Sequence, residues 1–152
     1  MKDNTNLLDY NQWSATEYGE NLDYLYNDNN KITVQPTKEW SEIGENSLKI
    51  KNNINKGDWF RIWYNNTLPN KTVTLKITIR TSPNNIGQVM LQELNNWDTI
   101  NATSVQIPKD TVEDIELSLV ASNNHTRFAI YIKNYDVSNS DVFVDNISLT
   151  TN

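Results

Sequence analysis

Hydrophobic and polar residues alternate along most of the chain. The clearest run covers residues 71–81, where apolar side chains at every second position are separated by threonine, lysine and arginine. This period indicates β-strands with one buried face, because successive side chains of a strand point to opposite faces. The same alternation recurs in shorter segments, at residues 32–34, 48–50, 89–91, 115–119, 128–132 and 142–149.

Short polar segments separate these runs and supply the turns. They are rich in Asn, Asp, Ser and Pro, residues that favour turns, and they include residues 27–30, 52–57, 82–85, 95–98, 122–124 and 137–141. About ten short strands with turns between them predict an all-β fold, a β-sandwich jelly roll of two antiparallel sheets. The length of 152 residues and the lack of an internal linker predict a single domain over residues 1–152.

One predicted strand, within residues 58–66, carries more large aromatic side chains than a core needs. Alternation divides them into two sets, Trp59, Arg61 and Trp63 on one face and Phe60, Ile62 and Tyr64 on the other. Phe60 and Ile62 suit a core, which favours an exposed binding surface on the opposite face. The reverse arrangement, with the tryptophans in the core, stays open because alternation alone does not determine which face is buried.

Composition narrows the class of partner. The formal net charge is −6 at pH 7 and the sequence pI is about 4.7. We therefore predict neither a nucleic-acid nor a membrane partner, since nucleic acids and anionic membranes need a basic surface. No apolar run reaches the length of about 18 residues that a membrane-spanning helix needs. The chain has no cysteine, which excludes disulfides, thiolate metal ligands and cysteine nucleophiles.

The sequence lacks the common catalytic motifs. It has no Gly-X-Ser-X-Gly elbow, no phosphate-binding glycine loop and no zinc-type histidine pair. The single histidine, His125, lies in a polar segment that predicts a solvated loop tip. Glu113 and Asp114 are adjacent on a predicted strand, so they face opposite ways and cannot flank one glycosidic bond. We therefore predict that the protein is not an enzyme.

The Trp-X-Arg-X-Trp pattern of Trp59, Arg61 and Trp63 suits a sugar ligand. Flat aromatic rings can stack on the C–H faces of sugar rings, while the sugar hydroxyls need planar polar partners. Neighbouring strands and an adjacent predicted loop offer further side chains for such a surface, namely Gln88, Gln92, Tyr131 and Trp97. Together these residues predict a glycan-binding face.

Asp145 lies inside the apolar segment 142–147. By alternation it shares a face with Phe143 and Ile147. A carboxylate buried in that setting needs a partner or a metal ion. Alternatively, Asp145 faces solvent at a sheet edge, and the sequence leaves both interpretations open.

Four short segments, taken in order, give the chain a resemblance to a known family. They are Asn-Leu-Leu at residues 6–8, Gly-Glu-Asn-Ser-Leu-Lys-Ile at 44–50, Leu-Pro-Asn-Lys-Thr-Val at 68–73 and Phe-Val-Asp-Asn-Ile-Ser-Leu at 143–149. With these segments the chain resembles the β-jelly-roll carbohydrate-binding modules related to families four, nine and twenty-two. It departs from them at Asn70, where glycine is usual, and at residues 10–13, which replace a Gly-Phe-Glu segment.

The resemblance implies a non-catalytic, monomeric module that binds a polysaccharide or oligosaccharide. Such a module targets a linked enzyme or surface protein to its glycan, so the resemblance also implies an extracellular or cell-surface location. It implies a structural Ca²⁺ ion, held by Asp145, by Glu45 or Glu42 and by the main chain near Leu8 or Asp9. Because the same fold occurs in structural and adhesive domains of surface and tail-fibre proteins, a module with a protein partner is the alternative.

Overall fold

The computed structural model describes residues 32–41, 47–52, 59–83, 86–134 and 141–152. The opening segment 6–8 and residues 44–46 of the second resembling segment lie outside this set. The described residues form nine β-strands and no helix, so this part of the chain holds no membrane-spanning helix. The strands are β1 (Ile32–Thr37), β2 (Ser47–Asn52), β3 (Trp59–Tyr64), β4 (Thr72–Thr81), β5 (Gly87–Asn95), β6 (Asp98–Ile107), β7 (Val112–Val120), β8 (Arg127–Asn134) and β9 (Asp141–Thr151).

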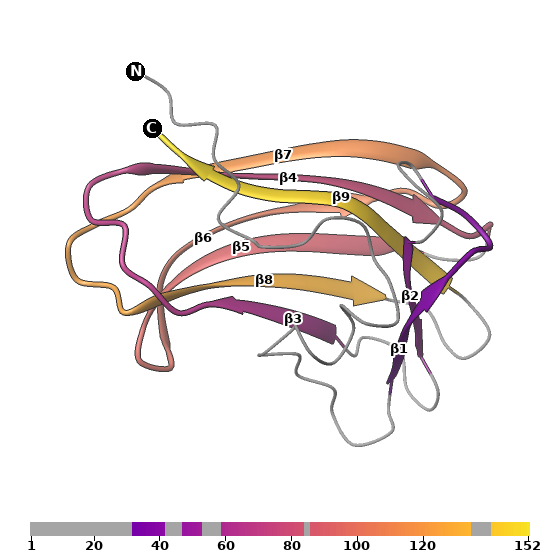
Figure 1. Ribbon diagram of the computed structural model, residues 1–152, viewed down its shortest axis with the longest axis horizontal. Coiled ribbons are helices and arrows are strands. Elements are labelled where there is room, and N and C mark those ends of the chain that lie inside the picture. The colour runs from indigo at the N-terminus through magenta and orange to yellow at the C-terminus, as the bar shows by residue number, and fades with distance from the viewer. Residues whose placement is uncertain (1–31, 42–46, 53–58, 84–85, 135–140) are drawn as a thin grey trace.

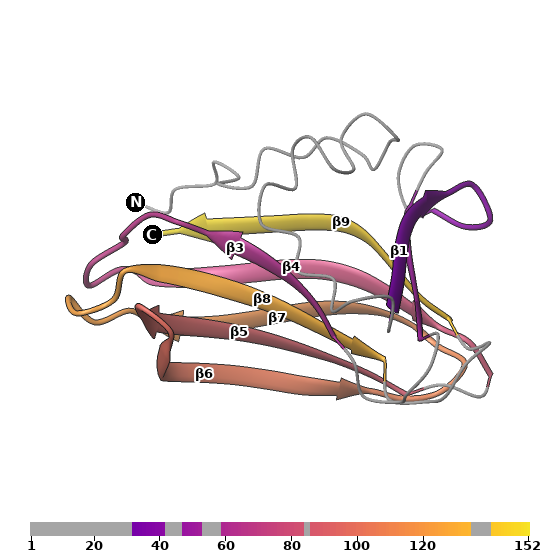
Figure 2. The same cartoon turned by 90° about the horizontal axis from the view of Figure 1, so that it is seen from below.

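The strands form two antiparallel sheets that lie face to face (Figures 1 and 2). We call the sheet with the order β3-β8-β5-β6 the front sheet and the sheet with the order β1-β2-β9-β4-β7 the back sheet. In Figure 1 the strands β9, β4 and β7 of the back sheet lie above the strands of the front sheet. Only the hairpins β1–β2 and β5–β6 stay within one sheet, and the other connections cross between the sheets. The prediction of an all-β jelly-roll sandwich is therefore confirmed.

One hydrophobic core fills the space between the sheets. Alternate residues of β4 face it, and all of Val73, Leu75, Ile77 and Ile79 are buried. The front sheet contributes Val89 and Leu91 from β5 and the triplet Phe128, Ile130 and Ile132 from β8. These are the apolar positions of the alternating runs in the sequence, because a period of two gives each strand one face for the core.

Strand β6 is absent from the strands predicted by alternation. It is an edge strand paired with β5, and nearly all of its residues are exposed until Ile107. Its main-chain hydrogen bonds to β5 hold it in place, so its side chains need no regular apolar pattern. The two strands are joined by a tight turn at Asn96 and Trp97, where Asn96 adopts a φ of 55°. Asparagine tolerates this left-handed conformation better than most residues.

A β-bulge in β9 changes the faces predicted around Asp145. Lys76 pairs with Ser148 and Thr78 pairs with Asp145, so one residue of β4 lies opposite both Asn146 and Ile147. Asn146 takes the positive φ of 51° that this extra residue requires. The prediction that Asp145 shares a face with Ile147 is therefore wrong, since Ile147 lies in the core on the far side of the bulge.

The burial of Asp145 and the position of β9 in the sheet decide between the two interpretations of this residue. Its exposed fraction is 0%, and β9 lies between β2 and β4 rather than at an edge of the back sheet. The interpretation as a buried carboxylate therefore holds, and the interpretation as a solvent-facing residue at a sheet edge is wrong.

We expect the core to respond to truncation according to burial. Ile79→Ala removes a side chain that is 0% exposed, and it should lower the free energy of unfolding by about 2–5 kcal/mol. The same change at Ile100, which is 42% exposed, is the matched control and should cost much less. Urea unfolding of both variants measures the difference. Equal losses at the two positions would contradict the assignment of the core.

Candidate functional site

The outer face of the front sheet carries the candidate site. Ile62 is 2% exposed and belongs to the core, and Tyr64 packs against that core. Trp63 packs instead against a second cluster on the opposite face, formed by Leu94, Ala129 and Tyr131. The arrangement with Trp63 in the core is therefore wrong. The Ile62 face of β3 is buried, and the Trp63 face looks away from the other sheet.

Strand register brings the predicted site residues into three neighbouring rows. Each row takes one residue from β3, one from β8 and one from β5. The rows are Trp59–Lys133–Gln88, Arg61–Tyr131–Met90 and Trp63–Ala129–Gln92. For Trp59 and Arg61 only the backbone is described. One patch of one sheet thus holds four of the predicted site residues, which come from three strands: Trp63, Tyr131, Gln88 and Gln92.

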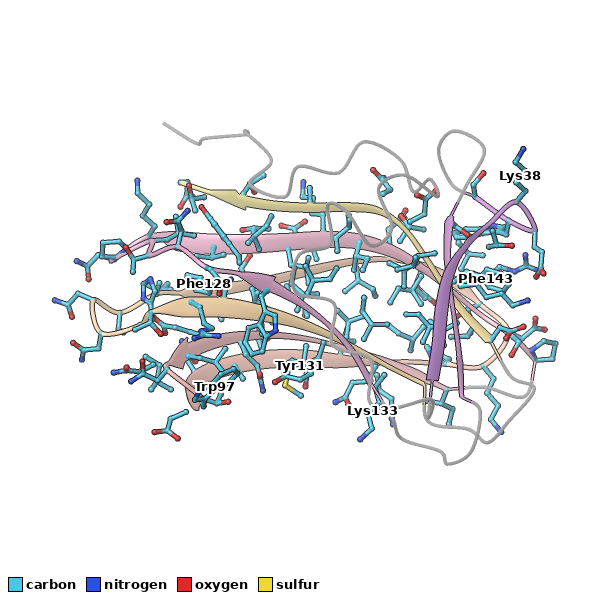
Figure 3. The ribbon with its side chains drawn as sticks, turned by 60° about the horizontal axis from the view of Figure 1, so that its bottom comes forward. Lys38, Trp97, Phe128, Tyr131, Lys133 and Phe143 are labelled. Carbon is cyan, nitrogen blue, oxygen red and sulfur yellow. The ribbon has the colours of Figure 1, made fainter. Side chains whose placement is uncertain are left out.

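Trp97 completes the site from the β5–β6 turn. It is 70% exposed, and its ring centroid lies 5.7 Å from that of Trp63 in an edge-on arrangement with an interplanar angle of 82°. Figure 3 shows Trp97, Tyr131 and Lys133 along one side of the front sheet, with Phe128 on the other. The turn therefore carries an open aromatic ring to the end of the rows.

Arg127 is the residue of this site that the sequence did not reveal. Its guanidinium carbon lies 5.1 Å from the ring centroid of Trp63 and 4.6 Å from that of Trp97. A cation held over two indole rings contributes about 0.5–1 kcal/mol per contact at an exposed site, and it fixes how the rings are oriented. Alternation in β8 does place Arg127 on the face opposite Phe128, but only the pairing of β8 with β3 and β5 brings it to the tryptophans. We call this group the Trp63–Arg127–Trp97 cluster.

Gln92 and Tyr131 are less open than the sequence suggests. Tyr131 is 5% exposed and packs in the second cluster, so its ring forms part of the floor. Gln92 is 9% exposed, and its Nε2 lies 3.1 Å from the sulfur of Met90, a weak acceptor. Within the described residues, its Oε1 is buried and has no hydrogen-bond partner. This oxygen is shielded from solvent, so it is not itself open to a donor from a bound molecule.

The prediction of a solvated His125 is wrong. His125 is 5% exposed, and its Nε2 accepts a 2.7 Å hydrogen bond from the backbone N–H of Leu68. Its Nδ1 lies 2.7 Å from Oε2 of Glu93, which is 1% exposed, although these two atoms are not aligned for a hydrogen bond. The ring also packs at 4.6 Å on Phe128. The polar neighbours of His125 in sequence hid this, because its contacts come from distant segments.

The surroundings of His125 indicate a structural role rather than catalysis. Oε2 of Glu93 accepts hydrogen bonds from Ser122, at 2.8 Å from the backbone nitrogen and 3.1 Å from the hydroxyl. Ser122 thus donates to Glu93 and not to His125, while Nε2 of the histidine is occupied by Leu68. The hydroxyl of Ser122 therefore does not form the serine–histidine contact that activates the nucleophile in a Ser-His-Asp triad. The group instead ties the β3–β4 and β7–β8 connections to β5.

The predicted calcium ligands are described only in part. Asp145 is buried, whereas Glu45, Glu42, Leu8 and Asp9 all lie outside the described residues. Within the described ranges, no group of three or more His, Cys, Asp or Glu side chains could hold a metal ion. A buried carboxylate is compatible with a Ca²⁺ ligand, and Ca²⁺ also takes main-chain carbonyl oxygens. The calcium site stays a prediction.

Comparison with known proteins gives matches in structure only. No protein-family model and no curated protein sequence matches the chain. The enzymatically active domain of tailspike protein 4 from bacteriophage CBA120 aligns with a TM-score of 0.67 and 11% identity, over 80% of this chain and 18% of the tailspike chain. The CBM22-1 xylan-binding domain of Paenibacillus barcinonensis Xyn10C aligns with a TM-score of 0.62 and 12% identity, over 79% of this chain and 81% of the domain. A family 16 carbohydrate-binding module aligns with a TM-score of 0.62 and 18% identity, over 84% of this chain and 91% of the module.

These likenesses establish the fold. Most of the similar structures are carbohydrate-binding modules, and they include a family 4 module with a TM-score of 0.55 at 14% identity. The resemblance to β-jelly-roll carbohydrate-binding modules is thus confirmed at the level of fold. The chain spans most of each module named here but less than a fifth of the tailspike chain.

The structural role of His125, and above all its hydrogen bond with the Leu68 N–H, can be tested by truncation. His125→Ala leaves the Leu68 N–H without its acceptor, and we expect a loss of roughly 1–3 kcal/mol in the free energy of unfolding. Asn123→Ala, at an exposed position of the same connection, is the control and should stay within about 0.5 kcal/mol of the unchanged protein. Chemical denaturation measures both. A His125 variant as stable as its control would show that the histidine is solvated after all.

Calcium binding has a separate test. If Asp145 is a ligand, added Ca²⁺ should raise the melting temperature of chelator-treated protein, because a ligand that binds only the folded state stabilises it. The rise should be lost in Asp145→Asn, which keeps the size of the side chain. A melting temperature that is the same in excess Ca²⁺ and in excess chelator would eliminate the site.

Proposed function

We propose that the protein binds a polysaccharide or oligosaccharide, without cleaving it, on the outer face of the front sheet. The observation that carries the proposal is the Trp63–Arg127–Trp97 cluster, in which two indole rings lie on a sheet face outside the core. Trp97 is 70% exposed, so most of its ring is open to a ligand. The similar carbohydrate-binding modules support the class of ligand.

The chemistry of this face fits a sugar chain. Trp97 and Trp63 provide flat apolar surface for sugar rings, while Gln88 and Gln92 lie in the same rows and provide side-chain amides for hydroxyl groups. Trp59 and Arg61 extend the same rows by register, so the proposed surface follows β3 over its whole length. A ligand that follows several rows must itself be extended, which favours a chain of sugar units over a single one. Tyr131 supports the surface from below.

The function of such binding is targeting. A module that holds a glycan keeps a linked catalytic or adhesive partner at a high local concentration on its substrate. We place this activity outside the cell or on its surface, where polysaccharides are found, with the module as a monomer. Calcium, if bound at Asp145, would be structural, because β9 belongs to the other sheet.

A structural or adhesive role with a protein partner is the second candidate. This candidate rests on the fold alone, which also occurs within a bacteriophage tailspike chain. The two candidates differ in what they expect of the Trp63–Arg127–Trp97 cluster, because a spacer domain needs no sugar affinity at all. A glycan array therefore separates them, and a complete lack of glycan binding would favour the structural role.

Removing the stacking rings should weaken glycan binding without unfolding the protein. Each stacked ring contributes on the order of 1–2 kcal/mol, so Trp97→Ala and Trp63→Ala should each raise the Kd roughly 5- to 30-fold. Trp40→Ala is the matched control, because Trp40 packs at 6.2 Å on Phe143 of the back sheet. Affinity electrophoresis or calorimetry with an array-positive glycan gives the ratios. Unchanged affinity in folded Trp63 and Trp97 variants would refute the proposed face.

A further inference from the structure

A pocket lies between the end of β5, β6 and the segment that follows β7. The β5–β6 turn and the β7–β8 connection lie at the same end of the sandwich (Figures 1 and 2). The pocket has a volume of about 700 Å³, within the range of roughly 300–1,000 Å³ that is common for small-molecule sites. We call it the end pocket.

The end pocket lies on the other side of β5 from the Trp63–Arg127–Trp97 cluster. Gln92 and Glu93 are adjacent in β5 and therefore point to opposite faces. Gln92 belongs to the row of Trp63 on the outer face, whereas Glu93 lines the end pocket and pairs with Phe128 of the core. The two sites are thus separate, although one strand supplies both.

Glu93 gives the end pocket an anchored acceptor. It is 1% exposed, and its Oε2 is held by the backbone nitrogen and hydroxyl of Ser122 and by the close approach of His125. Both hydrogen bonds from Ser122 go to Oε2, and the other oxygen, Oε1, is not among the fully buried unpaired atoms of the described residues. A carboxylate that is fixed through one oxygen can use the second to accept a hydrogen bond from a ligand.

The remaining lining narrows the chemistry of the ligand. Asn95, Asn101 and Asn124 provide amides that both donate and accept hydrogen bonds, and Nδ2 of Asn101 donates at 3.5 Å to the carbonyl oxygen of Val120. Beside them lie two apolar side chains that are open to solvent, Ile100 at 42% and Val120 at 68% exposure. A carboxylate repels anions, and a simple cation would be served by acceptors alone. Several neutral hydroxyls on a compact ring with C–H faces match all parts of this lining.

We propose that the end pocket is a second saccharide site, which binds one sugar unit through Oε1 of Glu93 and the three asparagine amides. This inference rests on the proposed function, because the ligand is the glycan that the protein binds. No indole among the described residues lines the pocket, so it offers hydrogen bonds to one sugar unit rather than a stacking surface for a chain.

NMR titration can follow the two sites independently. The side-chain NH₂ signals of Asn95, Asn101 and Asn124 report on the end pocket, and the indole N–H signals of Trp63 and Trp97 report on the sheet face. The probes are xylohexaose, cellohexaose and β-1,4-galactotriose, added to the whole chain. With at least one probe, we expect both groups of signals to shift in a saturable way.

Variants then assign the affinity. The double variant Asn101→Ala, Asn124→Ala should lose the end-pocket shifts and weaken that site about tenfold or more, while the indole shifts persist. Asn123→Ala is the matched control, since Asn123 is exposed in the same connection and does not line the pocket. Trp97→Ala should weaken binding at the sheet face, as reported by the indole N–H of Trp63, while the end-pocket shifts persist. End-pocket shifts that survive in the double variant at full affinity would overturn the inference.

The pattern of shifts separates failure of this inference from failure of the proposed function. Shifts confined to the indoles would overturn the end pocket and leave the sheet-face site standing. Shifts confined to the asparagine amides would support the end pocket and refute the sheet face. If no probe shifts either group, both proposals are overturned.

Discussion

The structure depends on one constraint, which is that a strand has two faces and this sandwich has one core. Each strand of the front sheet gives its apolar face to that core, through residues such as Ile62, Leu91 and Ile130. Whatever lies at the intervening positions must face outward. The proposed glycan site follows from this, because Trp63 and Gln92 occupy those positions on neighbouring strands. Neither side chain is needed for the core between the sheets.

The same constraint explains why the end of the sandwich is polar inside. At this end Glu93 of β5 and His125 of the β7–β8 connection are both buried. Their buried groups are bound largely within the chain, through Ser122 and the Leu68 N–H. These contacts tie the β3–β4 and β7–β8 connections to β5 at one end. The connected loops then present both Trp97 and the end pocket, so the proposed sites share one rigid support.

Local patterns in the sequence were enough to predict much of this architecture. The alternation in β4 and β8 indicates both the strands and their buried faces, since each face is chosen by its own side chains. Which face of β3 is buried could be anticipated only as a preference. The face with Phe60 and Tyr64 and the face with Trp59 and Trp63 are both apolar enough for a core. The contacts of Ile62 and Trp63 with two different clusters decide it.

The features that the sequence did not reveal depend on contacts between distant segments. Arg127 reaches the tryptophans only because β8 lies between β3 and β5, and His125 is buried only because Glu93 and Leu68 meet it. The bulge at Asn146 inserts one residue and reverses the faces that simple alternation assigns around Asp145. Strand β6 carries little apolar pattern, because an edge strand is held by its main chain. Each miss thus has a physical cause beyond the local sequence.

The central claim is that the outer face of the front sheet binds a glycan. Its most direct test is a crystal structure of the protein with the oligosaccharide that binds most tightly on a glycan array. The account predicts sugar rings stacked on Trp97 and Trp63, with hydroxyl groups within hydrogen-bond distance of Gln92 and Gln88. A complex in which the sugar occupies another surface, and the Trp63–Arg127–Trp97 cluster contacts no ligand, would contradict it.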